Sequence, residues 1–233
     1  MIRTVWLDNP PVNAINPDVI AAIRDAVADP GDARVIVLRG RGEKAFSAGA
    51  DIRAFTESEG GARAIQQTAD AIEAAPVPVV AAIHGFCLGG GLEVALGCDV
   101  RIAHVDTQIG LPEVRLGLLP GGGGTQRLPR LVGRGRAAWM ILSGERIPAR
   151  QAEAWGLVEF VFDDLDAGIE QVAGTLARQS RSAMATIKRV LRETGAARDD
   201  DVEHAAFEAA RASEDGKEGV AAFLEKREPR WSA

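Results

Sequence analysis

Short runs of apolar, β-branched residues alternate with helix-type spacing along the first two thirds of the chain. Continuous apolar runs at residues 35–38 and Val79–Ile83 predict buried strands, and Ile2–Leu7 alternates well enough for another strand. Between Ile2–Leu7 and the strand at residues 35–38, the Asn16-Pro17 pair predicts a capped amphipathic helix. Further strands are expected at residues 99–103 and 158–162, and a further helix at residues 62–75. This alternation indicates an α/β protein.

Helices dominate after Gly135. The spacing of apolar residues predicts helices at residues 137–142, 149–155, 165–179, 182–193, 202–212 and 216–226. Several amphipathic helices that follow a strand-rich core need a surface to cover. That surface is either the core itself or another subunit.

The strand Val79–Ile83 is followed by a glycine turn and by a helix at residues 92–96. A helix that begins on glycines presents free backbone N–H groups and the positive end of its dipole, so it can bind an anion. Glu93 lies three residues after Gly90, and its carboxylate can face the same pocket as the Gly90 N–H. A second acid, Glu113, follows Pro112 in an apolar setting. Two such carboxylates suggest acid/base chemistry.

Each of these features also has a purely structural interpretation. Glu93 could be a solvated residue on a helix face or a cap, and Glu113 could occupy the first turn of a short helix. The small residues Ala48, Gly49 and Ala50 would let a ligand approach the backbone, and the Ala50 N–H could be the second donor of an oxyanion hole with Gly90. The same residues could equally pack a tight turn.

Four consecutive glycines at residues 121–124 superficially resemble a phosphate-binding loop. No Gly-Lys-Ser or Gly-Lys-Thr follows them, so the motif of nucleotide hydrolases is absent. We interpret the four glycines as a tight start to a helix at residues 125–132.

Composition narrows the class of protein. The chain has 233 residues, of which 46% are apolar and 26% charged, and its net charge of −6 argues against a nucleic-acid partner. No apolar run approaches the ~20 residues that cross a bilayer, and no signal peptide is visible, so we expect no membrane partner and a cytoplasmic protein. Cys87 and Cys98 are expected to be buried thiols, and the three histidines are scattered, so no metal site is predicted.

Several long motifs occur in a fixed order along the chain. They are LDNPPVNA at residues 7–14, FSAGADI at residues 46–52, GGGLE at residues 89–93, GLPEVRLG at residues 110–117 and FLEKR at residues 223–227. With these motifs the chain resembles the crotonase (enoyl-CoA hydratase/isomerase) superfamily over nearly its whole length. Some segments especially resemble the hydratase/isomerase part of bifunctional β-oxidation enzymes, without a following dehydrogenase domain.

The resemblance implies a fold and an assembly. The fold would be an α/β, crotonase-like ββα spiral core over residues 1–175, followed by a C-terminal helical trimerisation region over residues 176–233. The chain would form homo-oligomers, either trimers or pairs of trimers. Its substrate would be an acyl-CoA thioester, with no cofactor apart from the coenzyme A that the substrate carries.

The resemblance also implies roles for individual residues. Ala50 and Gly90 match the two residues whose N–H groups form the oxyanion hole of the family. Glu93 and Glu113 match the two catalytic acids of the hydratases, of which Glu93 helps to activate water and Glu113 delivers the proton. The residues that match the segment lining the CoA site are Ala48, Ala50, Asp51, Ile52, Arg53 and Gly90. Close carboxylates are expected to titrate as a coupled pair.

The chain departs from the family pattern at two places. The family usually has another strand before Ile2–Leu7, and Arg53 stands where a lysine is common. Phe223 and Lys226 resemble positions that reach a CoA site across a subunit boundary.

Three other functions are compatible with the same residues. One is an isomerase that converts a 3-enoyl to a 2-enoyl thioester, for which Glu113 alone could shuttle the proton. A second is a non-catalytic relative that binds acyl-CoA or RNA, although the acidic balance argues against RNA. A third is another thioester reaction on the same fold. The presence of Glu93 beside Glu113 favours hydration, which makes an enoyl-CoA hydratase the leading interpretation.

Overall fold

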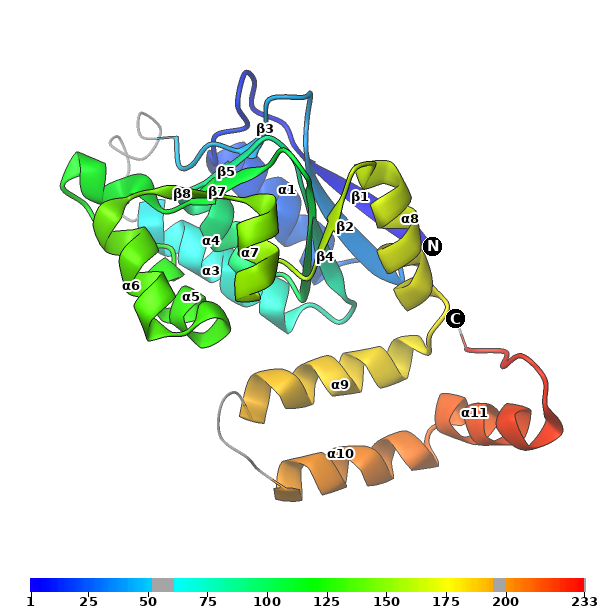
Figure 1. Cartoon of the computed structure of the whole chain (residues 1–233). Coiled ribbons are helices and arrows are strands. Elements are labelled where there is room, and N and C mark those ends of the chain that lie inside the picture. Colours follow the sequence, from blue (N-terminus) through cyan, green and yellow to red (C-terminus); the bar gives the residue numbers. More distant parts are fainter. Residues whose placement is uncertain (52–60, 195–199, 233) are drawn as a thin grey trace.

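A five-stranded parallel sheet forms the centre of the fold (Figure 1). The computed structural model describes residues 1–51, 61–194 and 200–232. The sheet has the order β1-β2-β4-β6-β9, and all neighbouring strands are parallel. Its strands are β1 (Ile2–Leu7), β2 (Val35–Gly40), β4 (Val79–Ile83), β6 (Val100–His104) and β9 (Phe160–Phe162). Each of them lies where the sequence predicts a strand.

Both faces of this sheet are covered, which explains why its inner strands are continuous apolar runs. In β2, Ile36 and Leu38 face the main core, whereas Val35 and Val37 face helix α8 (Leu165–Ala177) on the other side. Every residue of β4 is buried. A strand with only one buried face would instead alternate apolar and polar residues.

A second, smaller sheet has the order β3-β5-β7-β8. Its strands are β3 (Ala45–Ser47), β5 (Phe86–Leu88), β7 (Gln108–Gly110) and β8 (Arg146–Pro148). The first three are parallel to one another, and β8 is antiparallel to β7. The sequence did not predict β5 or β8, because three residues are too few to show a period and β5 lies between the glycines of the predicted turn.

Three of the long strands, β2, β4 and β6, lead into a short strand of the second sheet and then into a helix. This ββα unit occurs as β2-β3-α3, as β4-β5-α4 and as β6-β7 followed by the 3-10 helix η1 and α5. The bounds are α3 (Gly61–Ala74), α4 (Gly90–Leu96), η1 (Pro112–Leu116) and α5 (Gly124–Val132). The expectation of a ββα spiral core is confirmed.

The remaining helices of the core complete its cover. Helix α1 (Pro17–Ala28) begins at the predicted cap, where the Asn16 side chain accepts the Val19 N–H at 2.8 Å. The helices α6 (Arg134–Ser143) and α7 (Ala149–Trp155) follow α5. Among the described residues, no helix combines the length and the apolar character needed to cross a membrane.

Three further helices form an arm beside the core (Figure 1). They are α9 (Arg181–Thr194), α10 (Asp200–Ala212) and α11 (Glu214–Glu225). Lys188 of α9 fixes the arm, because its buried ammonium group donates to the Ile72 carbonyl at 2.9 Å and to Asp99 Oδ2 at 2.6 Å. The predicted division between residues 175 and 176 falls in the last turn of α8, and it stays a prediction.

Candidate active site

The predicted site residues meet because three parallel strands end at one edge of the smaller sheet. Residues 48–50 follow β3, Gly89 and Gly90 follow β5, and Glu113 follows β7 on η1. The carboxyl ends of neighbouring parallel strands lie side by side, so the segments that follow them form a common crevice. The close pairing of β5 and β7 continues past the strands, since the Gly89 N–H donates to the Gly110 carbonyl at 3.0 Å.

These segments line a cavity of about 310 Å³. The predicted residues on its wall are Ala48, Ala50, Gly90, Glu93 and Glu113. Apolar side chains complete the lining, notably those of Ile65, Leu116, Leu118 and Leu119. The cavity is therefore mostly apolar, with two carboxyl groups and a glycine-rich backbone as its polar parts.

Two backbone N–H groups lie next to each other at this cavity. The Ile15 N–H donates to the Gly49 carbonyl, and the Asp51 N–H donates to the Ile15 carbonyl, each at 2.8 Å. Because these bonds flank Ala50, the Ala50 N–H points away from Ile15. Gly90 is the first residue of α4, where the helix offers no acceptor for its N–H. A Cβ at Gly90 would lie only 3.3 Å from the Ala50 nitrogen, so the backbones of the two residues lie close together.

The three glycines at residues 89–91 are required by close contacts. Gly89 has φ +50°, and a Cβ there would lie 3.1 Å from Glu113 Oε1. A Cβ at Gly91 would lie 2.6 Å from the Ser47 Cβ, which would push α4 off the end of β3. The glycines therefore set the distance between the two halves of the site.

The turn at residues 48–50 is supported by the preceding loop. The Ala48 N–H donates to the Val12 carbonyl at 3.0 Å. The buried Asn13 side chain donates to the carbonyls of Arg41 and Ala45, at 2.9 and 2.7 Å. In the sequence, residues 7–14 contributed only to the family resemblance. This structural role of Asn13 was missed because it depends on contacts with residues about 30 positions further along the chain.

Glu93 is buried and held by two backbone donors from the four-glycine segment. Its Oε1 accepts the Gly122 N–H at 2.7 Å and the Gly124 N–H at 2.9 Å, at the start of α5. Burial raises the pKa of Glu93, whereas the Gly124 and Gly122 donors and the charge of Arg127 lower it. These donors stabilise the ionised carboxylate.

The sequence suggested that the four glycines at residues 121–124 only begin a helix. The structure shows that they also contact Glu93. A Cβ at Gly122 would lie 2.5 Å from Glu93 Oε2, and one at Gly124 would lie 3.1 Å from Glu93 Oε1. Sequence reasoning missed Gly122 and Gly124 as site residues. Their only signal was the run of glycines itself, because the chemistry lies in the backbone.

Glu113 lies in a different environment. It occupies the first turn of η1, as the structural interpretation of the sequence allowed, and it also lines the cavity. Its Oε2 is buried and has no hydrogen-bond partner in the part of the chain that the structure describes. Burial raises the pKa of Glu113 to about 7, its own backbone N–H lowers it, and the charge of Glu93 raises it further. Burial therefore contributes more to the raised pKa of Glu113 than the charge of Glu93 does.

The other predicted residues are placed as follows. Asp51 is half-buried, and Ile52 and Arg53 lie outside the described residues. Cys87 and Cys98 are buried, as expected, and burial raises the pKa of both thiols. Within residues 1–51, 61–194 and 200–232, no three His, Cys, Asp or Glu side chains are grouped to hold a metal ion.

Comparison with known proteins gives a consistent result. The family described as enoyl-CoA hydratase/isomerase matches residues 1–233. A probable enoyl-CoA hydratase of Bacillus subtilis (strain 168) is 39% identical over 99% of this chain and 95% of its own length. A crotonyl-CoA hydratase of Syntrophomonas wolfei is 39% identical over 97% of this chain and 92% of its own. The crystal structure of enoyl-CoA hydratase from Bacillus anthracis superposes with a TM-score of 0.92 at 35% identity, covering 99% of this chain and 95% of that one. The chain belongs to the enoyl-CoA hydratase/isomerase family.

Proposed function

We propose that this protein is an enoyl-CoA hydratase, which adds water across the 2,3 double bond of a 2-enoyl-CoA thioester to give a 3-hydroxyacyl-CoA. The observation that carries the proposal is the contrast between the two glutamates on one cavity. Glu93 accepts two N–H donors, whereas Glu113 leaves a buried oxygen without a partner. The hydratases named above support the same activity.

The N–H groups of Ala50 and Gly90 are proposed to hold the thioester oxygen. When a nucleophile adds to the β-carbon, negative charge develops on that oxygen as an enolate. Preorganised donors that face this oxygen stabilise the transition state by roughly 3 kcal/mol each. Both donors belong to the backbone, so they are fixed in place before the substrate binds.

The two carboxyl groups are proposed to divide the proton transfers. Glu93, ionised, orients the water and takes its proton as the oxygen bonds to the β-carbon. Glu113, protonated, gives its proton to the α-carbon. The backbone donors favour the charged form of Glu93, and the apolar surroundings favour the neutral form of Glu113.

An isomerase is the second candidate, because one carboxyl group with a pKa near 7 can carry a proton between two carbons. Hydration is favoured by the fixed position of Glu93, since a double-bond shift needs no ordered water.

The residues proposed to line the CoA side of the site are Ala48, Ala50, Asp51, Ile52, Arg53 and Gly90, and the reaction is proposed to use no cofactor beyond the CoA of the substrate. We also propose that the chain assembles into trimers or hexamers. The arm supports this, since it exposes large apolar side chains: Phe207 is 61%, Phe223 82% and Leu224 73% exposed. Such side chains are more often covered by a partner surface.

The test follows the loss of absorbance of the enoyl thioester with crotonyl-CoA, alongside an isomerisation assay with a 3-enoyl-CoA. Glu93→Gln and Glu113→Gln are each expected to lower kcat for hydration by 10²-fold or more, on the scale of ~10²–10⁴ for general acid/base groups. Glu43→Gln, at an exposed glutamate outside the cavity, serves as the matched control and should hydrate like the wild type.

Two results would overturn the proposal. If hydration is absent and isomerisation survives Glu93→Gln but not Glu113→Gln, the protein is an isomerase. If the folded wild type catalyses neither reaction but binds acyl-CoA, it is a non-catalytic relative.

A further inference from the structure

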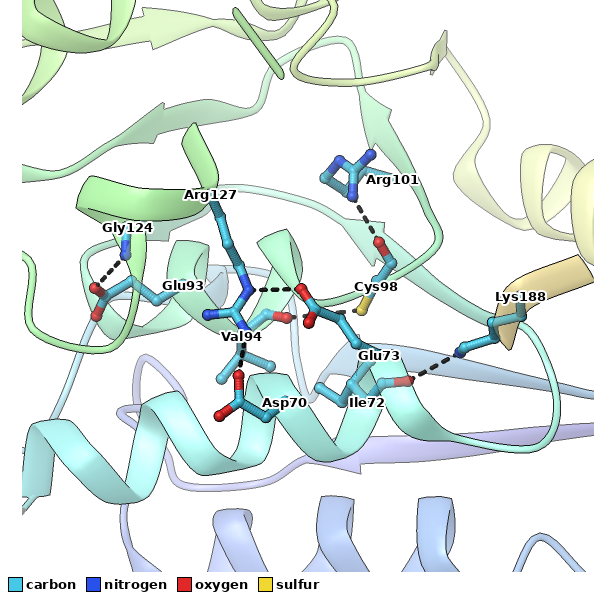
Figure 2. A network of polar contacts seen from close by, with 10 residues as sticks. All are labelled: Asp70, Ile72, Glu73, Glu93, Val94, Cys98, Arg101, Gly124, Arg127 and Lys188. Carbon is cyan, nitrogen blue, oxygen red and sulfur yellow. Dashed lines mark hydrogen bonds and ion pairs between the residues drawn. The ribbon is translucent and has the colours of Figure 1, made fainter. Parts of the chain in front are cut away.

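The segment that holds Glu93 is itself held by a buried arginine (Figure 2). Arg127 lies in the first turn of α5, and its side chain is 10% exposed. Its Nε donates to Glu73 Oε1 at 2.7 Å, and its Nη2 donates to Asp70 Oδ1 at 2.5 Å. Asp70 and Glu73 are three residues apart on α3 and so share one face of that helix. The guanidinium group is therefore fixed at two points on a neighbouring helix.

The same guanidinium group lies against the glycine segment. Gly123 has φ +108°, and a Cβ there would lie only 2.1 Å from Arg127 Nη1. In addition, the Arg127 N–H donates to the Gly123 carbonyl at 2.9 Å. Gly123 stands between Gly122 and Gly124, the two residues whose N–H groups hold Glu93. Arg127 thus packs directly behind the pair of donors. It is not among the described residues that line the cavity.

We propose that Arg127, clamped by Asp70 and Glu73, is a positioning residue for Glu93: it fixes the glycine segment and places a partly compensated positive charge behind the carboxylate. This inference rests on the proposed function for its kinetic meaning. Its structural content, the control of the Glu93 carboxylate by Arg127, can be measured without turnover.

The electrostatic part of the proposal involves a small set of groups. The charge of Arg127 from α5 acts on Glu93, and the charge of Glu93 acts in turn on Glu113 of η1. Arg127 is in turn faced by Asp70 and Glu73 of α3. The charge of Arg127 lowers the pKa of Glu93. Removing Arg127 should raise this pKa, whereas removing the charge of Glu73 leaves Arg127 less compensated and should lower it.

These opposite signs separate positioning from a merely structural role. If the substitutions only damaged the packing, the pKa of Glu93 would shift in the same direction in both variants or would not change. Arg127→Lys is a third test, because lysine keeps the positive charge but cannot contact both Asp70 and Glu73 of α3 as the guanidinium group does. It should retain most of the wild-type titration and still lose part of kcat.

The experiment is a carboxyl ¹³C NMR titration of the full chain labelled at glutamate, in which Glu93→Gln identifies the Glu93 signal. The titration is carried out for Arg127→Met, Arg127→Lys and Glu73→Gln. Arg130→Met, at an exposed arginine further along α5, is the matched control. The kcat of crotonyl-CoA hydration is measured over pH on the same samples. Arg127→Met is expected to lower kcat about tenfold or more, as misplacement of a catalytic group does.

The inference is upheld if Arg127→Met moves the Glu93 titration to higher pH, Glu73→Gln moves it to lower pH, and the acid limb of the kcat profile follows in each case. It is overturned if both variants move it in one direction or if neither moves it. Should Arg127→Met fail to fold, Arg127→Lys and Glu73→Gln still decide between these outcomes. If the wild type does not hydrate crotonyl-CoA, the proposed function fails, while the NMR titration tests the control of Glu93 on its own.

Discussion

The burial that raises the pKa of Glu113 should also lower the stability of the protein at neutral pH. Its pKa rises from the ordinary value of 4.5 to about 7 in the folded protein, mainly through burial. Between these two values the folded state holds a proton that the unfolded state has released, so the free energy of unfolding falls as the pH rises through this window. Glu113→Gln removes the titration. Relative to the wild type, the variant should therefore be more stable at pH 8 than it is at pH 4.5, although it loses its activity.

The magnitude follows from the two pKa values. A difference of this size, from 4.5 to about 7, corresponds to about 3 kcal/mol, since each pKa unit is worth about 1.4 kcal/mol. Because Glu113 is only half-buried, solvent screening reduces the expected effect to about 2 kcal/mol. The glutamine amide brings its own desolvation cost, but that cost does not change with pH. The quantity to compare is therefore the change in the wild-type-to-variant difference between pH 4.5 and pH 8.

Urea unfolding at one fixed protein concentration measures this difference, since an oligomer would otherwise change its apparent stability with concentration. Glu43→Gln is the matched surface control and should follow the wild type within about 0.5 kcal/mol at every pH. A difference between Glu113→Gln and the wild type that stays constant from pH 4.5 to pH 8 would refute the reasoning. So would a variant that becomes less stable relative to the wild type as the pH rises.

Two other substitutions test the framework around the site. Gly122→Ala places a Cβ 2.5 Å from Glu93 Oε2 and should lower kcat for crotonyl-CoA hydration by about 10²-fold, whereas Gly135→Ala, where nothing lies within 4 Å, should not. Lys188→Met leaves the Asp99 carboxylate without its cation and should cost about 3 kcal/mol in urea unfolding. It should also speed amide hydrogen exchange in α9, and unchanged exchange there would show that other contacts hold the arm.

Much of the fold could be predicted because its longer elements have strong local patterns. The predicted strand Ile2–Leu7 has the observed bounds, and the Asn16 cap starts α1 as the Asn16-Pro17 pair indicates. The strands β5 and β8 were missed because their pairing, not their three-residue sequences, makes them strands. Without β5, the alignment of three strand ends at the site could not be derived from the residues. The small residues suggested Ala50 as a second donor beside Gly90, and the resemblance placed Glu113 in the same site.

The contacts that hold Glu93 could not be predicted from the sequence for a different reason. Its donors are backbone N–H groups 29 and 31 residues further along the chain, and no side chain marks them. The ion pairs of Arg127 span 54 and 57 residues, so neither partner is visible from local spacing. A run of glycines indicates that the backbone must approach something closely. Only the fold identifies the carboxylate that it approaches.

In the proposed mechanism, the two glutamates acquire opposite roles from the backbone around them. Both are the same residue type, both line the same cavity, and burial raises the pKa of each. Two N–H donors and an arginine stabilise the charged form of Glu93, whereas Glu113 has a buried oxygen without a hydrogen-bond partner among the described residues. The proposed assignment of Glu93 as base and Glu113 as acid rests on this difference in hydrogen-bond donors. Because four glycines allow those contacts, exchanging the roles would require rebuilding the backbone and could not be achieved by changing either glutamate.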